Sequence, residues 1–239
     1  MAIHYYPLIN KVMTTLNLRD KIAFLQQDQD LAFSKPFITI AREPGSGGAP
    51  IAALVAKRLG FTLVDEEIID EIARSTRKRK EIIKAIDEKH RTALQDMVHS
   101  LLNPEYVDDM KYMTELVKVI LTYAHQGHVV ILGRGANFIT PFPKGLHISI
   151  TAPYRVRVQR AMKHEDLPDD EARELLGRVE KERKMFVKQY LKKDVDKANA
   201  YDLTINTTYF SLEQAADLVI EAFHHKFPRH VRYGAMFTR

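Results

Sequence analysis

The chain has 239 residues, of which 45% are hydrophobic and 28% charged, so it can form a sizeable core and is unlike a disordered protein. It contains no cysteine, which excludes disulfides and thiolate metal sites, and its formal net charge of +5 favours an anionic partner, either a nucleotide or a nucleic acid. The first residues lack a signal-peptide pattern and no run approaches the roughly 20 apolar residues of a membrane helix, so we expect a cytoplasmic protein with no membrane partner.

Residues 1–34 carry a helix-like pattern without a recognisable motif, and we expect an N-terminal helical extension there. From residue 35 onward, short β-branched runs alternate with helical patterns. The expected strands are 37–41, 61–64, 129–132, 146–151 and 203–206. The expected helical regions are 50–59, 66–125, 154–164, 169–192 and 212–226. This alternation predicts an α/β fold with a parallel sheet covered on both faces, whose ligands bind beyond the carboxyl ends of the strands.

A glycine-rich turn joins the first strand to the first helix of this pattern. It contains Gly45, Ser46, Gly47, Gly48 and Ala49, and Pro50 follows where a helix tolerates proline. Glycines allow the backbone to approach phosphate oxygens, and the N–H groups at a helix N-terminus favour an anion. The turn is therefore interpreted as a phosphate loop, with a ligand-free β–α turn as the alternative.

The loop departs from the Walker A pattern G-x-x-x-x-G-K-[ST]. If Gly47 is the second glycine, Gly48 stands at the lysine position and Ala49 at the Ser/Thr position. The lysine normally contacts the β/γ-phosphates and the hydroxyl binds magnesium. The backbone shape of a phosphate loop is thus predicted without its two reactive side chains.

Four blocks in order carry a family resemblance: R-E-P-G-S-G-G-x-x-I-A, L-G-F-x-L-V-D-E-E-I-I, V-V-I-L-G-R-G-A-N-F-I and Y-D-L-T-I-N-T-T. Together, over residues 35–226, they resemble the cytidylate kinase-like family, an offshoot of the P-loop nucleoside monophosphate kinases whose members typically lack the Walker lysine. The resemblance implies a three-layer P-loop NTPase domain over 35–239. A helical monophosphate-binding insertion is expected at 66–126 and a lid at 168–200.

The resemblance also implies the reaction, which is transfer of the ATP γ-phosphoryl group to a nucleoside monophosphate, CMP or dCMP. Mg²⁺ would arrive with the nucleotide, and no metal site on protein ligands alone is expected. Without the lysine, another cation must stabilise the charge on the transferred group. The candidates, in order of preference, are Arg183, Arg157, Arg42 and Arg160. Each could instead be a solvated surface charge.

Three further residues are candidates for substrate binding. Arg134 lies between two glycines at a strand end, where its guanidinium could bind phosphate or form a structural ion pair. Cytidylate kinases have G-R-D at this block, so Gly135 replaces their Asp. Asp65 either contacts the ligand or simply caps the following helix. Arg178 belongs to the lid segment of the resemblance.

Three functions remain open from sequence alone. The first is the nucleotide kinase, and the second is a nucleotide-binding sensor that has lost catalysis, which Gly48, Ala49 and Gly135 would explain. The third is a nucleic-acid binder using the basic stretch 74–80, which is unlikely because mixed charge on a helix is more often a solvated face. The oligomeric state is not predicted.

Overall fold

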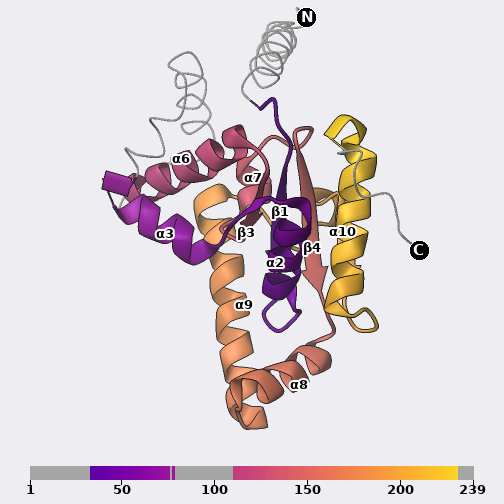
Figure 1. Ribbon diagram of the computed structural model, residues 1–239. Helices are drawn as coiled ribbons and strands as arrows, with labels where there is room; N and C mark the ends of the chain where they lie inside the picture. Colours follow the sequence, from indigo (N-terminus) through magenta and orange to yellow (C-terminus); the bar gives the residue numbers. More distant parts are fainter. Residues whose placement is uncertain (1–32, 76, 79–109, 231–239) are drawn as a thin grey trace, which may run out of the picture.

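The computed structural model describes residues 33–75, 77–78 and 110–230 (Figure 1). Its centre is one sheet of five strands: β1 (Phe37–Arg42), β2 (Thr62–Val64), β3 (Val129–Leu132), β4 (Gly145–Thr151) and β5 (Leu203–Asn206). All neighbours are parallel and the order is β2-β3-β1-β4-β5. In this register Ile40 lies opposite both Leu132 and Ile148, so the carboxyl ends of β1, β3 and β4 lie along one edge.

Helices cover both faces of the sheet. On one face lie α2 (Gly48–Leu59) and α10 (Leu212–Lys226), which bury Ile51, Val55 and Val219 against the strands. On the other face α3 (Glu66–Arg74), α6 (Met110–Gln126) and the short α7 (Ala136–Ile139) form the second half of the core. This is the three-layer arrangement that alternating strands and helices predict.

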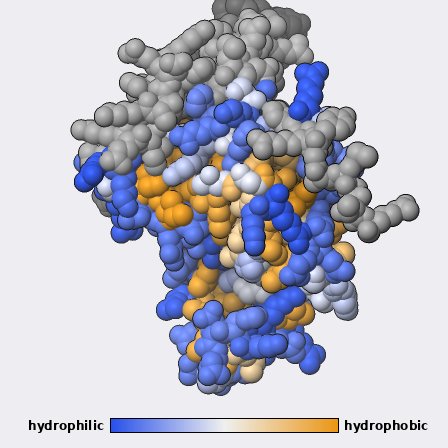
Figure 2. All heavy atoms as spheres, in the orientation of Figure 1, coloured by the Kyte–Doolittle hydropathy of each residue, from blue (hydrophilic) through white to orange (hydrophobic). Residues whose placement is uncertain are grey.

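Two helices extend from one end of the molecule. α8 (Tyr154–Glu165) leads away from the sheet, and α9 (Asp169–Leu191) returns beside it (Figure 1). Val158 and Leu176 join the two helices, whereas Val187 and Leu191 near the end of α9 belong to the main core. Hydrophilic side chains cover most of this extended end (Figure 2). Two 3₁₀ turns complete the described elements, η1 (Ala198–Ala200) and η2 (Pro228–His230).

The predicted fold class is confirmed, and each predicted strand is present with its ends within one residue. The long helical region expected over 66–125 contains α3 and α6, with residues 79–109 between them outside the described part. The expected N-terminal extension is also outside it, apart from residues 33–34. α7 was not predicted, because four residues are too few for a visible helical period. Within the described ranges, no helix combines the length and apolar character needed to cross a membrane.

Candidate active site

The predicted phosphate loop follows β1 and leads directly into α2. Gly45 and Gly47 have φ angles of 76° and 85°, in the left-handed region that favours glycine. Gly47 is the N-cap of α2 and offers no side-chain cap. The N–H groups of the first helical turn lack intrahelical partners, so they are available to an anion at this end of the helix.

Side chains behind the loop hold it in shape. Ser46 is buried, and its Oγ donates to the carbonyl of Glu43 at 2.8 Å. The carbonyl of Ser46 accepts from Thr207 Oγ1 at 2.8 Å and from Arg160 Nη1 at 3.3 Å. Arg160 Nη2 also donates to the Thr207 carbonyl at 2.7 Å. Arg160, a predicted catalytic residue, is therefore occupied with backbone carbonyls on the protein side of the loop.

Arg157 is a second support of the loop, with only 4% of the residue exposed. Its Nε donates to the Ala152 carbonyl at 2.9 Å, and its Nη1 donates to Glu180 Oε2 at 3.0 Å and to the Pro44 carbonyl at 3.4 Å. A Cβ on Gly45 would lie 2.8 Å from the Arg157 carbonyl, so this helix and the loop are in close contact. The geometry of Arg157 is that of a structural tie between the loop and α9.

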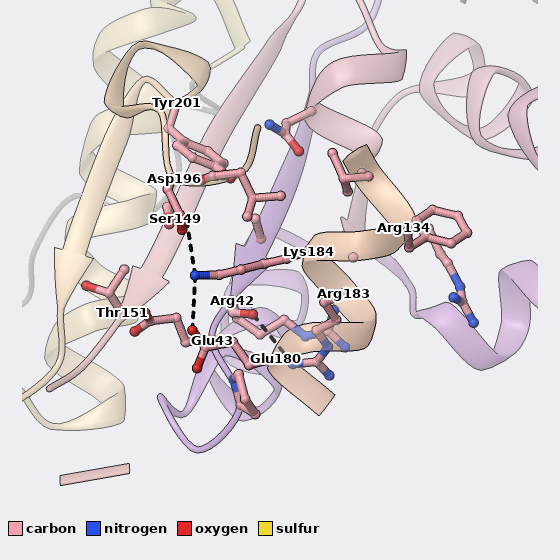
Figure 3. A pocket seen from close by; sticks show the side chains of 18 of the residues that line it. Arg42, Glu43, Arg134, Ser149, Thr151, Glu180, Arg183, Lys184, Asp196 and Tyr201 are labelled. Carbon is pink, nitrogen blue, oxygen red and sulfur yellow. Dashed lines mark hydrogen bonds and ion pairs between the residues drawn. The ribbon is translucent and has the colours of Figure 1, made fainter. Parts of the chain in front are cut away.

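A cavity of about 710 Å³ lies between the sheet edge and α9 (Figure 3). Its walls include Arg42 at the end of β1 and Glu43 after it, Gly133 and Arg134 after β3, and Thr151 at the end of β4. The cavity therefore lies at the carboxyl ends of the strands, where the sequence predicts the ligand site. Glu180, Arg183 and Lys184 of α9, which belongs to the segment predicted as a lid, close its other side.

Arg42 and Arg183 share one carboxylate in this cavity. Arg42 Nη2 lies 2.6 Å and Arg183 Nη2 3.4 Å from Glu66 Oε1, and Arg183 Nη1 donates to the Arg42 carbonyl at 3.5 Å. Burial raises the pKa of Glu66, but the two guanidinium groups outweigh it and the net pKa is lowered. Burial, followed by the charge of Arg42, lowers the pKa of Arg183. An anion entering here would meet two guanidinium groups that share a single carboxylate.

Arg134 lines the same cavity. It forms an ion pair with Asp70, its guanidinium lies 5.2 Å from the Phe186 ring centroid, and its φ of 51° is left-handed. Its Nε is buried and has no hydrogen-bond partner among the described residues. A Cβ on Gly135 would lie 2.7 Å from Leu191 Cδ1, so α9 leaves little room here for the Asp of the G-R-D block. Arg134 thus lines the cavity with its Nη2 bound by Asp70 and its Nε enclosed by protein.

The two other predicted substrate residues lie outside the cavity walls. Asp65 accepts a hydrogen bond from the Ile68 N–H at 2.9 Å and caps α3, which is its alternative structural role, while the neighbouring Glu66 lines the cavity. Arg178 is exposed on α9 and does not line the cavity. A role for either residue in ligand binding remains a prediction.

Lys184 was missed by the sequence interpretation. Its Nζ lies 3.1 Å from Glu180 Oε1 and 3.0 Å from Asp196 Oδ2, which places it across the cavity (Figure 3). Glu180 also binds Arg157, so a chain of charges connects the phosphate loop to the segment after α9. The i, i+4 spacing of Glu180 and Lys184 was a visible signal, although such pairs are common on solvated helices.

The groups at the site fit a phosphate ligand better than a metal ion bound by protein side chains alone. Among the described residues there is no group of three His, Cys, Asp or Glu that could hold a metal ion. Glu43 and Glu66 are the carboxylates nearest the loop in the cavity wall, and both are already bound by protein donors. The glycine cradle with its helix N-terminus fits a phosphate group, which would bring its own Mg²⁺.

The described residues of the basic stretch 74–80 do not line this cavity. Arg74 lies 5.6 Å from the Tyr112 ring centroid and Lys78 forms an ion pair with Glu71. Residues 79–80 lie outside the described part. Arg74 and Lys78 are therefore engaged with neighbouring residues, and the interpretation of the stretch as a solvated face remains a prediction.

The family model of the cytidylate kinase-like family matches residues 37–209, so the chain belongs to that family. The cytidylate kinase of Sulfolobus acidocaldarius is 26% identical over 192 residues, 79% of this chain and 94% of that protein. That of Methanocaldococcus jannaschii is 28% identical over 193 residues, 77% of this chain and 96% of that protein. A uronate isomerase of Corynebacterium glutamicum is 33% identical over 113 residues, but these are 47% of this chain and only 22% of that protein.

A solved structure supports the same fold. The crystal structure of an uncharacterized protein from Eubacterium ventriosum has a TM-score of 0.56 and 21% identity, covering 79% of this chain and 98% of that chain. Likeness at this level of identity shows the fold alone. The predicted family and the α/β fold are confirmed.

Proposed function

We propose that this member of the cytidylate kinase-like family transfers the γ-phosphoryl group of ATP to a nucleoside monophosphate, with CMP or dCMP as the preferred acceptor. The observation that carries the proposal is a cavity lined by Arg42, Arg134 and Arg183, whose wall also includes Pro44, the residue directly before the predicted phosphate loop at the start of α2. Phosphoryl transfer needs little more than aligned phosphates and positive charge around them.

Each part of the site has a task in this reaction. The N–H groups at the start of α2 bind the ATP phosphates, and Mg²⁺ carried by the nucleotide neutralises part of their charge. Arg134, on the opposite side of the cavity, binds the acceptor phosphate in the bidentate manner of guanidinium groups. Arg183 approaches from the lid helix and excludes water from the transferred group.

The names of the archaeal relatives support CMP as the acceptor, since they match most of this chain and nearly the whole of their own length. Gly135 favours a less selective site, because the Asp of the G-R-D block is replaced here. We therefore expect weaker activity with UMP.

One observation favours a second function, that of a nucleotide sensor without catalysis. Gly48 and Ala49 replace the lysine and the hydroxyl residue of the Walker pattern, and both normally act on the phosphates being transferred. A sensor needs only the loop backbone. The kinase is preferred because Arg42 and Arg183 line the cavity and can supply the positive charge that the Walker lysine would otherwise provide.

The test is a coupled ADP-release assay with ATP, Mg²⁺ and a panel of acceptors: CMP, dCMP, UMP, AMP and small non-nucleotide alcohols. We expect ADP release that depends on CMP or dCMP and exceeds the release without acceptor. ATP binding without phosphorylation of any monophosphate would contradict the kinase and support the sensor. Phosphorylation of an alcohol instead would keep the phosphotransferase and overturn the acceptor.

A further inference from the structure

Arg42 and Gly48 occupy the first and seventh positions of the Walker A pattern, where that pattern has a glycine and a lysine, respectively. In G-x-x-x-x-G-K the first position is glycine and the seventh is lysine. In this chain, residues 42–48 read R-E-P-G-S-G-G, so the first position is Arg42 and the seventh is Gly48. The number of cationic side chains at the two positions is unchanged.

The structure explains why the exchange must be reciprocal. A Cβ placed on Gly48 would lie 2.4 Å from Arg42 Cβ and 2.8 Å from Arg42 Cγ, closer than real Cβ contacts allow. A side chain at one of these positions therefore excludes a side chain at the other. The aliphatic part of Arg42 fills the space from which a Walker lysine would begin.

The rest of Arg42 continues from this point into the cavity. A Cβ on Gly133 would lie 2.3 Å from Arg42 Nη1, so the guanidinium passes closely over a second glycine. Only 8% of the Arg42 side chain is exposed, and Glu66 binds its Nη2 at 2.6 Å. Figure 3 shows Arg42 beside Arg183, which comes from α9.

We propose that Arg42 supplies the catalytic cation of the missing Walker lysine, reaching the phosphates from the end of β1 instead of from the start of α2. The inference rests on the proposed phosphotransferase and names the group that replaces its lysine. In the transfer, a bond forms between the γ-phosphorus and an acceptor phosphate oxygen while the bond to the β-bridging oxygen breaks. ADP leaves with that electron pair, and Arg42 keeps its protons and stabilises the charge.

The other predicted arginines are less suited to this task. Arg157 and Arg160 donate to the carbonyls of Pro44 and Ser46, which places their charge on the protein side of the loop. Arg183 comes from the lid helix and uses one nitrogen on the Arg42 carbonyl. Arg42 is the last residue of β1 and stands three residues before Gly45, so it is held beside the loop by the rigid sheet.

A two-residue exchange tests the proposal. Wild type, Arg42→Gly, Gly48→Lys and the double variant Arg42→Gly/Gly48→Lys are compared for kcat, with Arg155→Ala, an exposed arginine of α8, as the control. We expect Arg42→Gly to lose about 100-fold in kcat, the size of effect typical for one lost charge-stabilising donor. Gly48→Lys should also be impaired, because its side chain meets Arg42. The double variant should recover at least ten-fold over Arg42→Gly, and Arg155→Ala should match wild type.

Wild-type turnover in Arg42→Gly would overturn the proposal, as would a folded double variant no more active than Arg42→Gly. If the double variant does not fold, kcat of Arg42→Lys is compared with that of Arg42→Gly. A higher kcat in Arg42→Lys supports a role for the positive charge of Arg42. An equal loss of kcat in both variants contradicts it.

Nucleotide affinity separates this inference from the proposed function. Calorimetric titration should show that Arg42→Gly weakens ATP binding about ten-fold and leaves AMP binding unchanged, because only ATP carries the outer phosphates. If wild type phosphorylates no acceptor and Arg42→Gly still shows this selective loss of ATP affinity, the proposed kinase and the catalytic role of Arg42 both fail, and only a contact of Arg42 with the outer phosphates remains. If CMP is phosphorylated equally by both proteins, the kinase stands and Arg42 is excluded.

Discussion

Arg157 Nη1 lies 3.0 Å from Glu180 Oε2, in an ion pair that joins α8 to α9 behind the predicted phosphate loop. The same guanidinium also binds the carbonyls of Ala152 and Pro44. Because its donors bind the loop, the end of β4 and α9 at once, Arg157 ties the position of α9 to the shape of the loop.

The first prediction follows from this coupling. Arg157→Ala removes a buried cation and leaves Glu180 Oε2 and the carbonyls of Ala152 and Pro44 without this donor, while Lys184 still pairs with Glu180 Oε1, so we expect a loss of about 3 kcal/mol in the free energy of unfolding. Urea unfolding followed by circular dichroism measures it, and Arg155→Ala on the exposed face of α8 should change it by less than about 0.5 kcal/mol. Unchanged stability with lost turnover would instead support the catalytic role that the sequence predicts.

The second prediction concerns the phosphate loop. Gly47 has a φ of 85°, and a Cβ there would lie 2.9 Å from Leu212 Cδ2. Gly47→Val should abolish ATP binding, measured by calorimetry, and should also destabilise the fold, because a β-branched residue is strained at this φ. Gly60→Ala separates the two effects, since Gly60 has a φ of 67° but no neighbour within 4 Å and lies outside the loop. ATP binding that survives Gly47→Val would place the nucleotide elsewhere.

The third prediction concerns the acceptor. Arg134→Ala should raise KM for CMP at least ten-fold while KM for ATP changes less than two-fold, because the contact is to the acceptor phosphate in both ground and transition states. The position of Arg134 over Phe186 can be kept in Arg134→Lys, which should be intermediate. Equal changes in both KM values would point to a general disturbance of the cavity.

Local chemistry made the sheet and the loop predictable. The strands are short β-branched runs, and the loop has glycines where positive φ angles are required, so residues 37–49 could be interpreted without tertiary information. Asp65 and Glu66 are residues whose roles the local sequence could not predict. Both are acidic residues at the start of one helix, and only the packed structure assigns the cap to Asp65 and the cavity to Glu66.

The arginines were predictable as a group but not individually. Arg157 and Arg160 lie on one face of α8 as their spacing indicates, yet that face is turned toward the back of the loop. The direction of a long side chain depends on contacts between residues far apart in sequence. For the same reason the exclusion between Arg42 and Gly48 is visible only when the distance between their side-chain positions is known.

The last prediction concerns acid stability and arises from His147 of β4, which is fully buried and lies with Nδ1 2.7 Å from Thr39 Oγ1. Burial lowers the pKa of His147 from 6.5 to about 4, with Asp202 raising it and Lys226 lowering it to smaller extents. His147 therefore becomes protonated near pH 6.5 in the unfolded chain, but only near pH 4 in the folded protein.

The sign follows from the linkage between protonation and folding. Above pH 6.5 the histidine is neutral in both states and has no effect, and between pH 6.5 and 4 the free energy of unfolding should fall by about 3 kcal/mol as pH decreases. Urea titrations at pH 7.5, 6, 5 and 4.5 measure this slope, which should be reduced in His147→Gln even if that variant is less stable at every pH. His164→Gln, at an exposed position of α8, should keep the wild-type slope. An unchanged slope in His147→Gln would show that other groups, such as carboxylates with lowered pKa, account for the acid sensitivity.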